Sequence, residues 1–182
     1  MYVMIILLII LLIIGGAAIF AIHAYNNIQK LNVNVDEAES QINVQLQRRA
    51  DLIPNLVNTV KGYAKHEEST LKEITSLRNG LTNGDLQSRI TASQKLTTQV
   101  MAVAENYPDL KANSNFNSLQ EELTNTENKI GYARQLYNST VGTFNRAIAM
   151  FPGNLIAGMM NVQKRDYLKI EAATKVAPKV EF

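Results

Sequence analysis

The chain has 182 residues, of which 46% are hydrophobic and 19% are charged, and its formal net charge is +2. It contains no cysteine, which excludes a disulfide framework, a thiolate zinc site and a thiol nucleophile. Charges of both signs are mixed along the sequence, so the basic patch or stripe that is typical of a nucleic-acid-binding protein is missing. We therefore expect no nucleic acid among its partners.

The first segment of the chain is uncharged, because the first charged residue is Lys30. Residues 1–22 are apolar, and a helix of this length, at about 1.5 Å per residue, crosses the roughly 30 Å hydrocarbon core of a bilayer. The run lacks a basic start and is longer than the apolar core of a signal peptide, so an uncleaved anchor is favoured over a cleaved signal. We assign a transmembrane anchor to residues 1–25.

The membrane orientation follows from the distribution of basic residues, which begin only after the anchor, at Lys30, Arg48 and Arg49. Loops on the cytoplasmic side of a membrane span carry an excess of Lys and Arg. The sequence therefore favours a single-pass protein with its N-terminus outside and its body in the cytoplasm.

Between Leu31 and Arg78 a stripe of mostly apolar residues recurs every three or four positions, which is typical of an amphipathic helix. Pro54 lies within this stripe, and because the apolar register is kept across it, we expect a kinked but continuous helix rather than two separate ones. The glycines and asparagines of residues 79–85 then end a first helix that begins near Val3.

Two further amphipathic stripes follow over residues 86–107 and 116–151, and a shorter helix is expected at 155–160. Because each helix has one apolar face, these faces must pack against one another. The predicted fold is all-α: an N-terminal transmembrane helix leads into a long-helix antiparallel bundle of three to four helices at residues 26–176. A flexible tail is expected at residues 177–182.

No catalytic constellation is apparent in the sequence. His66 and Glu67 form half of a zinc-binding HExxH motif, but Thr70 occupies the position of the second histidine. The Glu-x-x-His motif of di-metal helical bundles is also missing. We therefore predict no enzymatic activity, no cofactor and no metal; an enzyme that uses Asp51, His66 and Glu67 is the alternative.

Several polar residues lie on or beside the apolar stripes, namely Arg49, Glu67, Arg78, Thr126, Arg134 and Asn145. Either these side chains reach solvent from the stripe's edge, or a buried ion pair such as Glu67 with Arg134 fixes helix register or a subunit contact. The first helix also has a face rich in amides and poor in charge, formed by Gln41, Asn43, Gln45, Gln47, Asn55 and Asn58. Either solvent or a second copy of the chain would cover this face.

Three long motifs lie in the body of the chain. They are Gln47-Arg48-Arg49-Ala50-Asp51-Leu52-Ile53-Pro54-Asn55-Leu56-Val57, Tyr107-Pro108-Asp109-Leu110-Lys111-Ala112-Asn113 and Ala133-Arg134-x-x-Tyr137-Asn138. The sequence resembles the bacterial LemA family through these motifs. The resemblance implies an anchored membrane protein with a long-helix antiparallel bundle and no established enzymatic activity. It also implies an association with the cell envelope and stress and, in one branch, with the formation of magnetosome membranes.

From the family motifs and the polar stripe positions we select candidate residues for assembly, which are Arg48, Arg49, Asp51, Pro54, Asn55, Glu67, Arg78, Arg134, Tyr137 and Asn145. We predict a non-enzymatic, single-pass protein of the bacterial inner membrane whose bundle forms a homo-oligomer and scaffolds or remodels the envelope membrane. Its expected partners are the lipid bilayer, copies of itself and another envelope membrane protein. The alternative is a membrane-anchored adaptor or regulator of another envelope protein, such as a protease.

Overall fold

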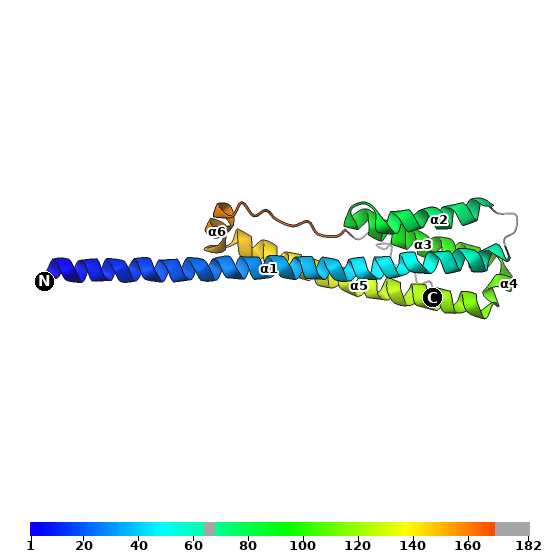
Figure 1. Ribbon diagram of the computed structural model, residues 1–182, viewed down its shortest axis with the longest axis horizontal. Helices are drawn as coiled ribbons and strands as arrows, with labels where there is room; N and C mark the ends of the chain where they lie inside the picture. Colours follow the sequence, from blue (N-terminus) through cyan, green and yellow to red (C-terminus); the bar gives the residue numbers. More distant parts are fainter. Residues whose placement is uncertain (64–67, 170–182) are drawn as a thin grey trace, which may run out of the picture. The chain divides into compact units, whose positions relative to one another are not determined.

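A computed structural model describes residues 1–63 and 68–169 of the chain. In these residues all regular structure is helical, which confirms the predicted all-α class (Figure 1). The six helices are α1 (Tyr2–Lys61), α2 (Glu68–Thr82), α3 (Leu86–Asn106), α4 (Pro108–Lys111), α5 (Ser114–Ala149) and α6 (Gly153–Met159).

The chain divides into two compact units. Unit 1 combines Met1–Ala38 with Leu136–Tyr167, and unit 2 combines the described residues of Glu39–Gln135 with Leu168 and Lys169. Helices α1 and α5 therefore each contribute to both units. The predicted tail at residues 177–182 lies outside the described residues.

Helix α1 contains Pro54 and continues past it to Lys61, so the predicted continuity across this proline is confirmed. The prediction that the same helix extends to the asparagines and glycines at 79–85 is wrong. The chain turns after Lys61, where the Tyr63 N–H donates to the Val60 carbonyl at 2.9 Å, and α2 begins at Glu68. Gly62 lies in this turn, and glycine disfavours a helix interior by about 1 kcal/mol relative to alanine.

Unit 2 is an up-down-up-down bundle in which α1 and α3 run in one direction and α2 and α5 in the other (Figure 1). Its core consists of apolar side chains from all of these helices, including Ile42, Leu46, Ile53, Leu56, Ile74, Leu81, Ile90, Leu96, Phe116, Leu123 and Ile130. The break after Lys61 divides the predicted first helix between α1 and α2, so that α1, α2, α3 and α5 form this bundle, in agreement with the predicted three to four helices.

The turn between α2 and α3 is built as the sequence predicts. Gly84 adopts a φ of 102°, in the left-handed region that glycine tolerates best. Asp85 then caps α3, since its carboxylate accepts hydrogen bonds from the Ser88 N–H at 2.9 Å and the Ser88 hydroxyl at 2.7 Å. These bonds favour the ionised carboxylate and lower the pKa of Asp85.

Unit 1 packs the first part of α1 against the last part of α5, through Ile28, Val35, Val141, Phe144 and Ile148. The prediction that the α5 stripe includes Phe151 is wrong, because α5 ends at Ala149 and Phe151 is 78% exposed. Pro152 explains the difference, since the residue before a proline disfavours the helical conformation.

Candidate functional site

The buried polar side chains fall into two clusters, one in each unit. Among the described residues these side chains are Arg49, Ser93, Thr126 and Asn145. Three of them lie on the helix stripes of unit 2, and Asn145 lies in unit 1.

The cluster of unit 2 is centred on Arg49 of α1, whose side chain is 0% exposed. Its Nη1 donates to the Leu123 carbonyl at 3.0 Å and to Glu127 Oε2 at 2.6 Å, both on α5. Its Nη2 donates to the Ser93 carbonyl at 3.2 Å and to Thr97 Oγ1 at 2.7 Å, both on α3. One guanidinium therefore joins three helices.

The charge of Arg49 is balanced inside the bundle. Burial lowers the pKa of Arg49, and the nearby Glu127 carboxylate opposes this change. Because the ordinary pKa of arginine lies far above neutrality, the guanidinium stays protonated at neutral pH. The carboxylate also accepts from the Ser93 hydroxyl at 3.2 Å and from the Thr97 hydroxyl at 3.4 Å.

Such an ion pair defines the relative positions of helices better than it stabilises them, because desolvation offsets much of the attraction between the charges. The cluster holds a cation, a carboxylate and two hydroxyls, with no histidine or other base near neutrality. Within the part of the chain that the structure describes, no group of three or more His, Asp or Glu side chains is arranged to hold a metal ion. The geometry of the Arg49 cluster thus supports a role in positioning α1, α3 and α5 relative to one another.

The neighbouring candidates lie on the surface of unit 2. Arg48 donates to Glu122 Oε2 at 2.9 Å, and both side chains of this pair are close to half exposed. Asp51 is exposed and accepts from Gln47 at 2.9 Å. Pro54, Asn55 and Arg78 are exposed as well. The structure therefore does not bring these candidates together with Arg49.

The predicted pair of Glu67 with Arg134 lies partly outside the described residues, because Glu67 belongs to the segment 64–67. Arg134 itself is half-buried and donates to the Lys169 carbonyl at 3.1 Å. The buried ion pair in the described part of the chain is that of Arg49 with Glu127. Glu127 was not among the predicted candidates, although it directly follows Thr126 of the α5 stripe.

The cluster of unit 1 attaches the extended segment that follows α6. The Asn145 amide donates to the Arg165 carbonyl and accepts from the Arg165 N–H, each at 2.9 Å, and the Tyr137 hydroxyl donates to the Asp166 carbonyl at 3.2 Å. The Arg165 guanidinium in turn donates to Asn32 at 3.0 Å and to Asp36 at 2.9 Å on α1. Tyr137 and Asn145 thus belong to one contact. Arg165 was missed because an extended segment lacks helical periodicity.

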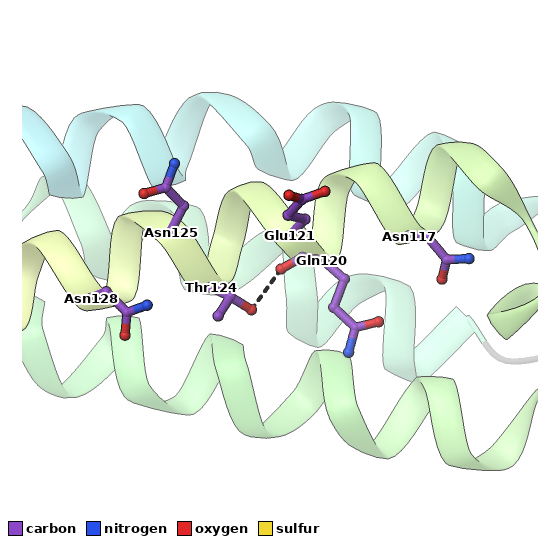
Figure 2. Close-up of a pocket in the computed structure, with 6 residues that line it drawn as sticks. All are labelled: Asn117, Gln120, Glu121, Thr124, Asn125 and Asn128. Carbon is purple, nitrogen blue, oxygen red and sulfur yellow. Dashed lines mark hydrogen bonds between the residues drawn. The ribbon is translucent and has the colours of Figure 1, made fainter.

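The exposed face of α5 in unit 2 carries a row of amides. An open depression of about 460 Å³ lies along it, lined by Asn117, Gln120, Glu121, Thr124, Asn125 and Asn128 (Figure 2). Within this row the Thr124 hydroxyl donates to the Gln120 carbonyl at 2.8 Å. The amide face predicted on α1 is partly used inside the unit, since Asn43 accepts from Arg89 at 2.7 Å.

The N-terminal part of α1 differs from every other described helix in its exposure. Each side chain of residues 1–20 is exposed, and most are large and apolar. Among the described residues α1 alone is long and apolar enough to cross a membrane.

Together the fold and these features define a helical-bundle protein with an N-terminal helix that is able to span a membrane. The model of the LemA family matches residues 38–182, and the chain belongs to this family.

The chain is similar to proteins of a mycoplasma and of a magnetotactic bacterium. Protein LemA of Metamycoplasma hominis is 26% identical over 144 residues, which is 75% of this chain and 65% of the relative. Magnetosome proteins MamQ 2 and MamQ 1 of Paramagnetospirillum magneticum are each 22% identical over 179 residues, which is 82% of this chain and 66% of the relative. The chain spans slightly less than two thirds of the length of these relatives.

The buried pair predicts a clear difference between two glutamates of α5. Glu127→Ala in the full chain should lower the free energy of unfolding by about 3 kcal/mol or more, because it leaves a buried cation without its counter-ion. Glu122→Ala removes only the partner of the exposed Arg48 and should cost about 1 kcal/mol or less. Denaturant unfolding in detergent micelles, followed by helical circular dichroism, measures both values. If both variants lost the same free energy of unfolding, the buried pair of Arg49 with Glu127 would contribute no more to stability than the exposed pair of Arg48 with Glu122.

Proposed function

We propose that this protein is a non-enzymatic, single-pass membrane protein whose helical bundle self-assembles and scaffolds or remodels the bacterial envelope membrane. The exposed apolar side chains of residues 1–20 support the anchor, since large exposed apolar surfaces mark membrane or protein contacts. The helix is also long enough for the hydrocarbon core, which needs about 20 apolar residues.

The observation that carries self-assembly is the amide row of α5 in Figure 2. An amide side chain both donates and accepts hydrogen bonds, so two copies of such a surface complement each other. Glu121 is the one charged side chain among the six that line the depression, and like-charge repulsion between two copies is accordingly small. Lateral pairing through α5 is therefore a contact between identical surfaces.

Scaffolding follows from the shared helix. Because α1 is one helix from Tyr2 to Lys61, copies that associate through unit 2 bring their anchors into the same patch of membrane. Two relatives are named as magnetosome proteins, which favours a role in organising a cellular structure over a role in catalysis. The lipid bilayer and other copies of the chain are thus the proposed partners, with another envelope membrane protein as a further one.

Self-assembly is tested with single cysteines, because the chain has none of its own. Thr124→Cys lies in the amide row, and mild oxidation of membranes should convert it to a disulfide-linked dimer on a non-reducing gel. A disulfide requires Cα atoms within about 7 Å, so only a close and symmetric contact gives this product.

Thr98→Cys on α3 is the matched control. Both threonines are exposed and donate to the carbonyl four residues earlier, so the two substitutions disturb the protein alike. We expect little dimer from the control. If Thr124→Cys stays monomeric, lateral pairing through α5 is refuted, and a band that joins it to a different protein instead would support the adaptor alternative.

We further propose that the anchor lies in the inner membrane with its N-terminus outside and the body in the cytoplasm, because no Lys or Arg precedes Lys30. Green fluorescent protein fused after Phe182 should fluoresce in cells, and alkaline phosphatase at the same position should be inactive. Two lysines inserted after Met1 should weaken this preference in the same assay. An active phosphatase fusion of the unaltered chain would place the body outside and overturn the orientation.

A further inference from the structure

A second uncharged segment lies in unit 1, at the corner between α5 and α6. The sequence has no charged residue between Arg146 and Lys164, and the segment includes the end of α5 and all of α6. Its large apolar side chains point outward, with exposed fractions of 64% for Met150, 78% for Phe151, 59% for Leu155 and 86% for Met159. Scattered exposed apolar residues are ordinary, but a cluster of them marks a contact surface.

This corner is held against α1 at the level where the apolar run ends. A groove of about 390 Å³ is lined on one side by Phe20, His23, Ala24, Asn27 and Ile28 of α1. Its other side is formed by the corner residues Ala147, Met150, Phe151, Pro152 and Gly153. Figure 1 shows α6 next to α1, which agrees with this groove.

The position of the corner is tightly determined. A Cβ atom added at Gly153 would lie 2.1 Å from the Ala147 carbonyl oxygen, so only glycine allows α6 to turn back on the end of α5 at this distance. Ile28 lies on the neighbouring α1 surface and is 2% exposed. The exposed apolar side chains of the corner are therefore carried by a backbone that packs closely against the end of α5 and against α1.

The depth of the corner follows from α1. The apolar run ends at Ile22, and a 1.5 Å rise per residue places Ile28 only about 9 Å further along the helix axis. Amphipathic helices that lie on a membrane bury their apolar side about 5–10 Å into the boundary between headgroups and acyl chains. A groove that begins at Phe20 and His23 thus lies at this boundary when α1 spans the bilayer.

We propose that the α5–α6 corner is a second membrane contact, in which Met150, Phe151, Leu155 and Met159 insert into the headgroup–acyl boundary beside the end of the span. The proposal rests on the proposed function, because it requires α1 to cross the bilayer. The exposed cations Arg146 and Lys164 flank the proposed inserted segment, and anionic lipid headgroups attract basic residues at a membrane surface.

Lipid fits this surface better than a second copy or a soluble partner does. The surface is continuous with the apolar face of α1 that is itself assigned to the bilayer, and it offers no acidic residue between its two flanking cations. Two attachment points, the span and the corner, restrict rotation of unit 1 about the axis of α1.

The test uses tryptophan, which the chain lacks. Phe151→Trp places the probe in the corner of the full-length protein, and Leu155→Trp places a second probe there in case the first variant folds poorly. Leu136→Trp is the matched control, because Leu136 is an exposed apolar residue of α5 in the same unit, 46% exposed, and lies nearly four helical turns before the helix ends. Leu11→Trp reports on the span itself, because Leu11 is 70% exposed, lies in the middle of the apolar run and does not line the groove.

The variants are reconstituted in vesicles of phosphatidylcholine and phosphatidylglycerol, part of which carries bromine on the acyl chain either near the headgroup or near the bilayer centre. The fluorescence of the Trp at position 151 or 155 should be quenched by shallow bromine more than by deep bromine, and the Trp at position 136 should keep its fluorescence. Quenching at position 11 without quenching at 151 and 155 would overturn the second contact and leave the anchor intact. No quenching at position 11 would overturn both the anchor and the second contact.

Discussion

A buried guanidinium is the constraint on which the bundle of unit 2 depends. Arg49 donates two hydrogen bonds to α3 and two to α5 from its position on α1. Apolar side chains pack in several registers with similar energies, whereas a buried cation tolerates only the register that places the carboxylate and carbonyls around it. The buried side chains of Ile42, Leu46 and Ile53 contribute apolar packing to the core. The hydrogen bonds of Arg49 select one helix register for that packing.

The second constraint is the change in side-chain chemistry along α1. The helix is uncharged and exposed up to Phe20 and becomes amphipathic from Ile28 onward, without a linker between these parts. A protein that is folded in this way has no flexible tether between its proposed anchor and its body. The uncharged corner of unit 1 lies beside the end of the apolar run, where we propose that it is a second membrane contact. The proposed self-association through the amide row of α5 is compatible with the proposed anchor and with the corner contact, because the amide row consists of other residues.

Much of the fold could be predicted from the sequence because apolar periodicity reports burial directly. Val35, Leu96 and Phe144 were assigned to helix stripes and are buried. The division between α1 and α2 could not be predicted in this way, since the apolar register continues in phase across Gly62 and does not reveal the turn. Phe151 has the right spacing for the α5 stripe, but the proline after it ends the helix before that position is reached.

The candidate site was predicted less completely, for a physical reason. A polar residue on an apolar stripe can be recognised in one helix, as Arg49 was, but its partner depends on which helix lies opposite and in which register. Glu127 is 78 residues away in the sequence and is selected only by the assembled bundle. Arg165 lies in an extended segment without periodicity, so its contacts with Asn32 and Asp36 are a property of the tertiary structure alone.

A double-mutant cycle between Arg49 and Glu127 tests the central structural claim most directly. Arg49→Leu, Glu127→Ala and the double variant are compared with the unaltered chain by denaturant unfolding in the same detergent. If the two charges compensate each other inside the bundle, the double variant should lose less stability than the sum of the single losses, by about 1 kcal/mol or more. Losses that add to within about 0.5 kcal/mol would contradict a role for this pair in holding the three helices together.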